Sequence, residues 1–447
     1  MTNRLAGSIV VACACALAAC GNAAVRAAES GDLTKLRAEI AAKHQDGRLS
    51  NSDAAQIARA VASREIATAK DDKQALARVQ ETRACSVDLD DALEDRMQKH
   101  DGAGAEVAMD RLEDGRLSRG RARDLLDDQD DRWRAVGVRT LVKDDDGKRR
   151  RESILDPSPR VRRAAIHAAA EAQDPADLDV LVETARVDPE LLLRNEALRA
   201  TSAIARGEAG RGRAADLVTR LRDLWTSGDD AIREDIAVAW ALSPLFEAGG
   251  REALRVEIAQ GQGPGAIAAA GVVTRTAQKD AELVASANAL LVRTIAEGSR
   301  RDRLHAIATA RTSGPLLAAF HAAAKDDDPE IRIGALSRLL DSKENHDAAV
   351  RDLEAIAGYG AHGTDATDGR RRELASRARF ALANGGDVRI QAWIEEDLAS
   401  DIPERRVMAA SALAALGRAA RAAPLLADAD ASVRTRAACT LIVAARR

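Results

Sequence analysis

Apolar residues recur along this chain at intervals of three and four positions, the spacing of one face of an α-helix. Leu217, Leu221, Leu224 and Trp225 form one such stripe. No segment keeps the strict alternation of a β-strand over several residues. The pattern therefore predicts an all-α protein without a sheet. The clearest helices are predicted at 176–185, 214–225, 281–295, 348–356 and 388–398.

One motif returns from about residue 130 to the end of the chain. It consists of an acidic or proline-containing turn, an arginine, and then small apolar residues at helical spacing, as in 156–165. Aspartate before proline is typical of a helix start, because the carboxylate caps the first N–H groups and proline needs no partner there. Aligning the motif gives about ten copies at intervals of roughly 28 to 40 residues, a period typical of a solenoid of helix pairs.

This pattern resembles HEAT repeats, in particular the short Asp-Pro-x-Val-Arg-x-x-Ala-Ala type of bilin-lyase-like proteins. The match is most specific at 156–165, 328–336 and 430–438. The resemblance implies an α-solenoid, a HEAT/armadillo-like superhelix, in which the aspartate and arginine of successive copies bond as a structural ladder. The ladder residues that it implies are Asp156, Arg162, Arg194, Arg233, Asp328, Arg332, Arg406, Asp430 and Arg434.

The region before the repeats is helical but differently organised. The pentapeptide 46–50 recurs as 114–118, each time between two predicted helices. The end of a repeat array must be covered, because an uncapped end exposes apolar surface. We therefore predict a helical cap at 29–128 and a solenoid of about ten helix pairs at 129–447.

The first residues have the pattern of an export signal. An apolar run ends at Leu17-Ala18-Ala19-Cys20 and is too short to span a bilayer. The sequence resembles the lipobox of bacterial lipoproteins, which implies a signal peptide at 1–19 and acylation of the Cys20 thiol. The alternative is an ordinary secretory signal that happens to contain a cysteine.

Acylated Cys20 would hold the mature chain on a membrane through a tether at 20–28. By the same resemblance, an aspartate directly after the cysteine retains a lipoprotein in the inner membrane. Gly21 stands at that position. We therefore expect a lipid-anchored protein of the bacterial cell envelope, on the outer membrane.

Composition narrows the function further. The formal net charge is −4, and aromatic residues make up only 2% of the chain. Nucleic-acid binding needs a basic surface, and single-strand binding also needs stacking platforms, so no nucleic-acid partner is expected. Of the five cysteines, only Cys85 and Cys439 remain after Cys20 and the signal are set aside. They lie near opposite ends of an extended array, so we expect two buried thiols, with a link to another chain as the alternative.

The sequence offers little reactive chemistry. None of the seven histidines stands in a His-x-x-x-His pair or beside a glutamate, and no Gly-x-Ser-x-Gly elbow occurs, so no metal, cofactor or catalytic residue is assigned. One loop, at 357–370, interrupts the repeat and contains Tyr359 and His362. Long loops in repeat arrays often bind ligands, whereas a tolerated surface insertion is the simpler interpretation.

The leading hypothesis is a membrane-anchored, non-catalytic scaffold that binds protein partners on the solenoid surface. The alternative is a lyase-type or other enzyme related to the bilin-lyase HEAT proteins. A further alternative is a structural spacer near the membrane.

Overall fold

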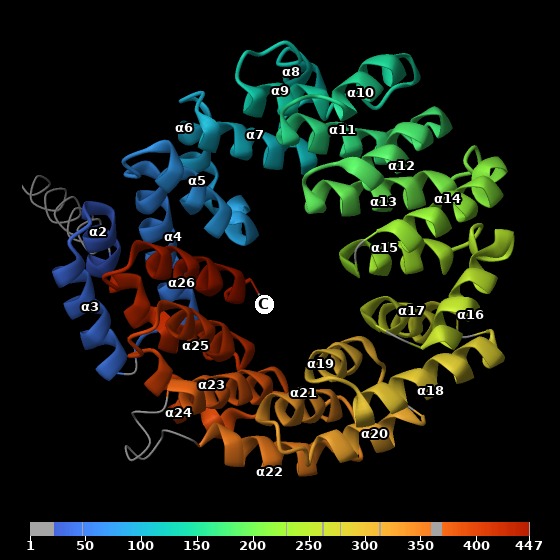
Figure 1. Ribbon diagram of the computed structural model, residues 1–447. Coiled ribbons are helices and arrows are strands. Elements are labelled where there is room, and N and C mark those ends of the chain that lie inside the picture. The colour runs from blue at the N-terminus through green and yellow to red at the C-terminus, as the bar shows by residue number, and fades with distance from the viewer. Residues whose placement is uncertain are drawn as a thin grey trace, which may run out of the picture. The chain divides into compact units, whose positions relative to one another are not determined.

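The computed structural model describes residues 22–46, 48–228, 230–261, 263–277, 279–312, 314–358 and 369–446 (Figure 1). Every regular element in these ranges is a helix and none is a strand, so the predicted all-α class is confirmed. No helix in the same ranges combines the length and apolarity needed to cross a membrane. The proposed signal at 1–19, Cys20, Tyr359 and His362 lie outside the described residues.

The chain divides into two compact units. Unit 1 contains both ends of the chain, residues 1–107 and 350–447, and unit 2 contains residues 108–349. This division differs from the predicted cap at 29–128 and solenoid at 129–447, whose boundary stays a prediction. Within unit 1 the helices near the N-terminus pack on the helices near the C-terminus.

Unit 2 is a succession of helices joined by short turns. Two helices, α7 (Gly102–Glu113) and α22 (His346–Ala357), lie across its boundaries. Between them come α8 (Arg119–Arg123), α9 (Asp131–Val138), η2 (Asp144–Asp146), α10 (Gly147–Ile154), α11 (Pro159–Ala172), η3 (Pro175–Asp177), α12 (Leu178–Val187), α13 (Leu191–Arg206), η4 (Arg211–Arg213), α14 (Ala214–Ser227), α15 (Asp230–Trp240), η5 (Phe246–Gly250), α16 (Arg251–Gln260), α17 (Gly263–Thr276), α18 (Ala281–Glu297), α19 (Arg300–Thr309), α20 (Leu316–Ala323) and α21 (Pro329–Leu339).

These helices pack in two rows. The odd-numbered helices from α9 to α21 each contact the next odd-numbered helix. The even-numbered helices from α10 to α20 form the second row, in which η5 connects α14 to α16. Each even-numbered helix also packs on the odd-numbered helix that follows it in the chain. Unit 2 is thus a two-layered stack of helix pairs.

Helix α17 is closely packed in the stack of unit 2. All residues from Gly265 to Thr274 are buried. A Cβ atom at Gly271 would overlap the Cγ2 atom of Thr309 on α19, so only glycine permits this approach. Small residues bring the two helices close enough for their backbones to pack.

Unit 1 is built from both ends of the chain. Its N-terminal helices are α2 (Ala23–Ser30), α3 (Leu33–Gln45), α4 (Asn51–Ala67), α5 (Asp72–Glu81), η1 (Arg83–Leu89) and α6 (Asp90–Met97). Its C-terminal helices are α23 (Gly369–Asn384), η6 (Val388–Ile390), α24 (Gln391–Asp397), α25 (Pro403–Ala415), η7 (Ala419–Ala427) and α26 (Ala431–Ala444). The last helix, α26, packs on α25 and η7 and also on α4 and α5 (Figure 1). The two segments share one core.

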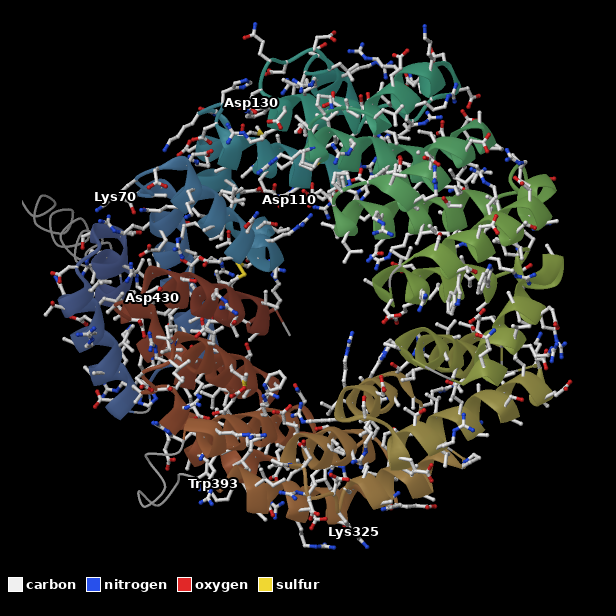
Figure 2. The ribbon with its side chains drawn as sticks, in the orientation of Figure 1. Lys70, Asp110, Asp130, Lys325, Trp393 and Asp430 are labelled. Carbon is white, nitrogen blue, oxygen red and sulfur yellow. A yellow bond between two sulfur atoms is a disulfide. The ribbon has the colours of Figure 1, made fainter. Side chains whose placement is uncertain are left out.

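A disulfide joins these segments. Cys85 on η1 and Cys439 on α26 are bonded, with their Cα atoms 5.4 Å apart, and both are buried (Figure 2). The expectation of two separate thiols, and of a rod with its ends far apart, is therefore wrong. The separation of the two cysteines in the sequence did not indicate their distance in space, because α26 packs on the N-terminal helices as well as on its neighbours in the chain.

The five helices predicted from periodicity are confirmed as α12, α14, α18, α22 and η6 with α24. The predicted tether at 20–28 needs correction. Asn22 caps α2 through the N–H of Ala24, and the helix runs from Ala23. Its alanines at 24, 27 and 28 are buried, so this segment belongs to the fold.

Candidate functional site

The arginines of the repeat motif hold consecutive turns together. In unit 2 the Nη1 atom of Arg162 donates to the carbonyl oxygens of Asp156 and Pro157, at 3.0 and 3.1 Å. The Nε and Nη2 atoms of the same side chain donate to the carboxylate of Asp188, at 2.7 and 3.0 Å. Arg162 therefore fixes the turn before its own helix and joins it to the turn of the following pair.

The same geometry returns along the chain. Arginines donate to the carbonyl six residues earlier in four further copies, at Arg134, Arg332, Arg406 and Arg434. The turn carboxylates that arginines of preceding copies reach are Asp156, Asp188, Asp326 and Asp428.

Two predicted ladder carboxylates also cap helices. Asp328 and Asp430 are N-caps, which accept from the backbone N–H groups of α21 and α26. Arg303 and Arg406 of the preceding copies pair with carboxylates two residues earlier, at Asp326 and Asp428. Asp328 also pairs with Arg300 of the preceding copy, at 2.6 Å. The sequence pattern alone does not distinguish them because both positions are aspartate in these copies.

Two other predicted residues stabilise helix ends. The Nε atom of Arg194 donates to the carbonyl of Ala185 at 3.0 Å, and that of Arg233 donates to Trp225 at 3.2 Å. The Arg233 guanidinium also lies 5.7 Å from the centre of the Trp225 ring. Carbonyl groups in the last turn of a helix lack intrahelical partners, and these arginines supply them.

The arginine of the copy at 430–438 bonds to a segment that is distant in the sequence. Arg434 on α26 donates through Nε and Nη2 to the carboxylate of Glu65 on α4, at 2.7 and 2.6 Å. Its Nη1 atom still binds the carbonyls of Asp428 and Ala429. Glu65 thus takes the place that Asp188 has beside Arg162.

Unit 2 also contains ion pairs that sequence reasoning missed. Arg139 pairs with Glu171 at 2.7 Å, and Arg199 pairs with Asp235 at 3.0 Å. Burial raises the pKa of Glu171, but hydrogen bonds from Arg139 and Arg119 outweigh it and leave the pKa below its ordinary value. The available signal was an arginine followed by a carboxylate 32 or 36 residues later, close to the repeat period.

One pair in unit 2 is fully enclosed. Arg150 on α10 is 0% exposed, and its Nε atom lies 2.5 Å from the carboxylate of Asp177, which is also 0% exposed. Its remaining donors reach Asp174 and the carbonyl of Leu141. This interaction holds α10 against η3.

The neighbouring turns of unit 2 that Arg162 bridges carry exposed apolar side chains. Leu155 directly precedes Asp156 and is 68% exposed, and Val187 directly precedes Asp188 and is 58% exposed. Leu191 and Leu192, at the start of α13, are 42% and 53% exposed. We call these four residues the apolar edge. The equivalent position before Asp326 is Lys325, labelled in Figure 2.

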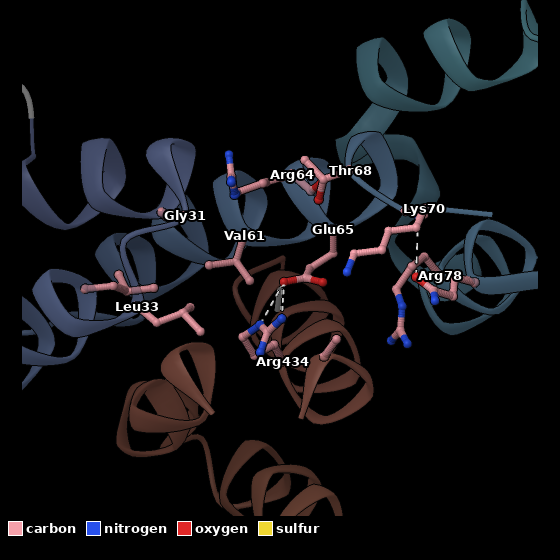
Figure 3. A pocket seen from close by; sticks show the side chains of 14 residues that line it. Gly31, Leu33, Val61, Arg64, Glu65, Thr68, Lys70, Arg78 and Arg434 are labelled. Atoms are coloured by element: carbon pink, nitrogen blue, oxygen red, sulfur yellow. Dashed lines mark hydrogen bonds and ion pairs between the residues drawn. The ribbon is translucent and has the colours of Figure 1, made fainter. Parts of the chain in front are cut away.

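Unit 1 contains a cleft where the two ends of the chain meet (Figure 3). It has a volume of about 530 Å³ and is lined by α2, α3, α4, α5 and α26. Buried Leu36 and Val61 contribute apolar surface to its wall. We call it the junction cleft.

The charged side chains of the junction cleft are four cations and one carboxylate: Arg64, Lys70, Arg78, Arg434 and Glu65. Arg434 takes up the carboxylate of Glu65. Arg78 bonds to Glu81 and, at 3.3 Å, to the hydroxyl of Thr435. Two cations remain without a carboxylate partner among the described residues, Arg64 and Lys70.

No group of three or more His, Cys, Asp or Glu side chains in the described ranges is arranged to hold a metal ion. No protein-family model matches the sequence, and no curated protein matches it either.

Proposed function

We propose that this chain is an exported, lipid-anchored scaffold without catalytic activity, which binds another protein through the apolar edge of unit 2. The observation that carries the proposal is the exposure of Leu155, Val187, Leu191 and Leu192 on two bridged turns. Scattered exposed apolar residues are normal, but several on adjoining turns are typical of protein-binding surfaces.

The edge is rigidly presented. Arg162 bonds to both turns, so Leu155 and Val187 stand on backbone that is held in place before a partner arrives. Preorganisation lowers the entropic cost of binding, because these residues need little further ordering. A shallow, preformed surface of this kind suits recognition of a folded protein.

A repeat architecture supports the same function. The two-layered stack of unit 2 and its Asp–Arg ladder agree with a HEAT-like superhelix, which is the architecture that we propose for the repeats. Helix-pair arrays present extended surfaces on which binding residues from several repeats act together.

Export has independent support. Disulfides persist in oxidising compartments and are rare in the cytosol, and Cys85 is bonded to Cys439. A bond at this site agrees with the lipobox-like segment that ends at Cys20. We propose that Cys20 anchors the chain in the bacterial cell envelope, on the outer membrane.

Site-specific photo-crosslinking in intact cells tests the binding surface. A photoreactive residue in place of Leu192 is expected to give one discrete adduct. The same residue in place of Lys325 is expected to give none, because Lys325 occupies the turn position of Leu155 and Val187 in a copy outside the apolar edge. Equal adducts at both positions, or none at either, would contradict the proposal.

Membrane fractionation tests the anchor separately. A Cys20→Ala variant is expected to leave the membrane pellet, since the thioether to the lipid requires the thiol. Retention of the variant in the pellet would remove the anchor from the proposal and leave the binding surface untouched.

A further inference from the structure

We infer that the junction cleft binds a phosphate group, and that the phosphate belongs to the headgroup of an anionic phospholipid in the membrane that holds the anchor. The location rests on the proposed function, because it uses the anchor at Cys20. The anion site itself rests on the side chains that line the cleft.

The first argument is the charge of the lining. Four cationic side chains face one carboxylate, in a chain whose formal net charge is −4. The carboxylate of Glu65 is held by two bonds from Arg434 and so does not neutralise the other cations. The cleft is therefore a local positive site in a protein that is acidic as a whole.

The second argument is the state of the two unmatched cations. The Nη1 atom of Arg64 donates to the carbonyl of Glu29 at 2.8 Å, which orients the guanidinium without cancelling its charge. Gly31 allows this placement, since a Cβ atom there would overlap the guanidinium. The ammonium group of Lys70 has no partner among the described residues, and Figure 3 shows its side chain extending toward Glu65.

The third argument is chemical fit. An oriented guanidinium binds phosphate oxygens in pairs, and a lysine adds a mobile point charge. Leu33, Leu36 and Val61 place apolar surface in the same cleft. A ligand with both a phosphate and a hydrocarbon portion matches these two kinds of lining, and a phospholipid headgroup with its glycerol has both.

The fourth argument is the distance from the anchor. Cys20 precedes the start of α2 by three residues, which span at most about 11 Å at 3.8 Å per residue. The eight residues of α2 add about 12 Å to reach Gly31, a residue of the cleft. An acylated Cys20 thus places the cleft close to the lipid headgroups.

Vesicle flotation tests the inference with residues 20–447 carrying Cys20→Ser, which cannot be acylated. The chain is expected to float with phosphatidylcholine vesicles that contain phosphatidylglycerol and not with vesicles of phosphatidylcholine alone. Lys70→Glu is expected to weaken this binding about tenfold, the effect of losing one charge-assisted contact. Lys70→Arg is expected to retain it.

Lys73→Glu is the matched control. Lys73 lies on α5, is exposed like Lys70, and does not line the cleft. It is expected to change binding less than twofold. Equal loss in the two variants would show attraction to general surface charge and would overturn the site.

Calorimetry with inorganic phosphate separates the two sources of the anion. Competition between phosphate and anionic vesicles, lost in Lys70→Glu, supports the full inference. Phosphate binding without vesicle binding would overturn the lipid source and retain the anion site. Binding of neither would overturn the site, whatever the result of the Cys20→Ala fractionation.

Discussion

The motif arginine Arg162 of unit 2 is held by near neighbours in the chain, whereas Arg434 of unit 1 is held partly by a distant segment. Arg162 bonds to Asp188, which is 26 residues later in the chain. Arg434 bonds to Glu65, which is 369 residues earlier. The geometry at the guanidinium is alike, with two bonds to a carboxylate and two to turn carbonyls. The local motif thus provides the turn carbonyls that the arginine binds, and the tertiary structure decides which carboxylate pairs with it.

The two arrangements differ in their entropic cost. Closing a long loop costs more than closing a short one, although the cost grows only slowly with length. Unit 1 combines several interactions between the chain ends: the Cys85–Cys439 bond, Arg434 with Glu65, and Arg446 with Asp88. Unit 2 stacks its pairs through contacts between successive helices.

The largest loss of stability is expected when the enclosed ion pair of unit 2, Arg150 with Asp177, is broken. Asp177→Ala leaves the Arg150 guanidinium buried without its closest carboxylate, which costs about 3–5 kcal/mol. Hydrogen-exchange mass spectrometry in urea is expected to show loss of protection in α10 and α12 first. Asp145→Ala, at an exposed site in the same region, is the control and is expected to stay within about 0.5 kcal/mol.

The second largest loss of stability is expected in unit 1, when its disulfide is removed. Cys85→Ser removes the bond between η1 and α26 and is expected to lower the free energy of unfolding by about 2–4 kcal/mol. Protection should fall in α4 and α26 while α11 and α13 keep theirs. An equal loss in both units would contradict the division of the chain.

Two further variants compare the Arg434–Glu65 and Arg162–Asp188 ion pairs directly. Glu65→Ala and Asp188→Ala each leave one arginine without its carboxylate, and each is expected to cost about 1–3 kcal/mol in urea unfolding. The effects should be of similar size but in different units. If Glu65→Ala has no effect on α26, Glu65 is not a substitute for a ladder carboxylate.

The smallest expected effects are changes of stability with pH, and they have opposite signs at one carboxyl group of unit 1 and one of unit 2. Burial raises the pKa of Glu81 in unit 1 above its ordinary value, although bonds with Ser432 and Arg78 act in the opposite direction. The stability that this group contributes is present below 4.5, its ordinary pKa, and is lost as pH rises through the raised value. Urea unfolding should therefore show the native chain losing stability relative to Glu81→Gln between acidic and neutral pH.

Asp326 in unit 2 should behave in the opposite way. Burial raises its pKa, but the hydrogen bonds from Arg303 and from the backbone N–H of Asp328, together with the charge of Arg303, outweigh this and leave the pKa below 3.8, its ordinary value. Its contribution is present above 3.8 and is lost as pH falls through the lowered value. Asp326→Asn should thus lose its destabilising effect in strong acid. A constant difference from the native chain would contradict the ion pair.

Much of the helical structure could be predicted from the sequence, and little of the candidate sites. The stripe at Leu217 and Leu221 predicts α14 because a helix must bury one face. The apolar edge could not be predicted, since Leu155 and Leu221 are the same residue type and only packing leaves one exposed. The junction cleft was also missed, because its cations come from segments more than 350 residues apart.

The sequence by itself determined that this chain forms short helices, because capping and hydrophobic periodicity act within a few residues. Only the tertiary structure decided that Cys85 meets Cys439 and that Glu65 completes the bonds of Arg434. These contacts depend on which helix faces pack together across the whole chain, and no local spacing encodes that choice.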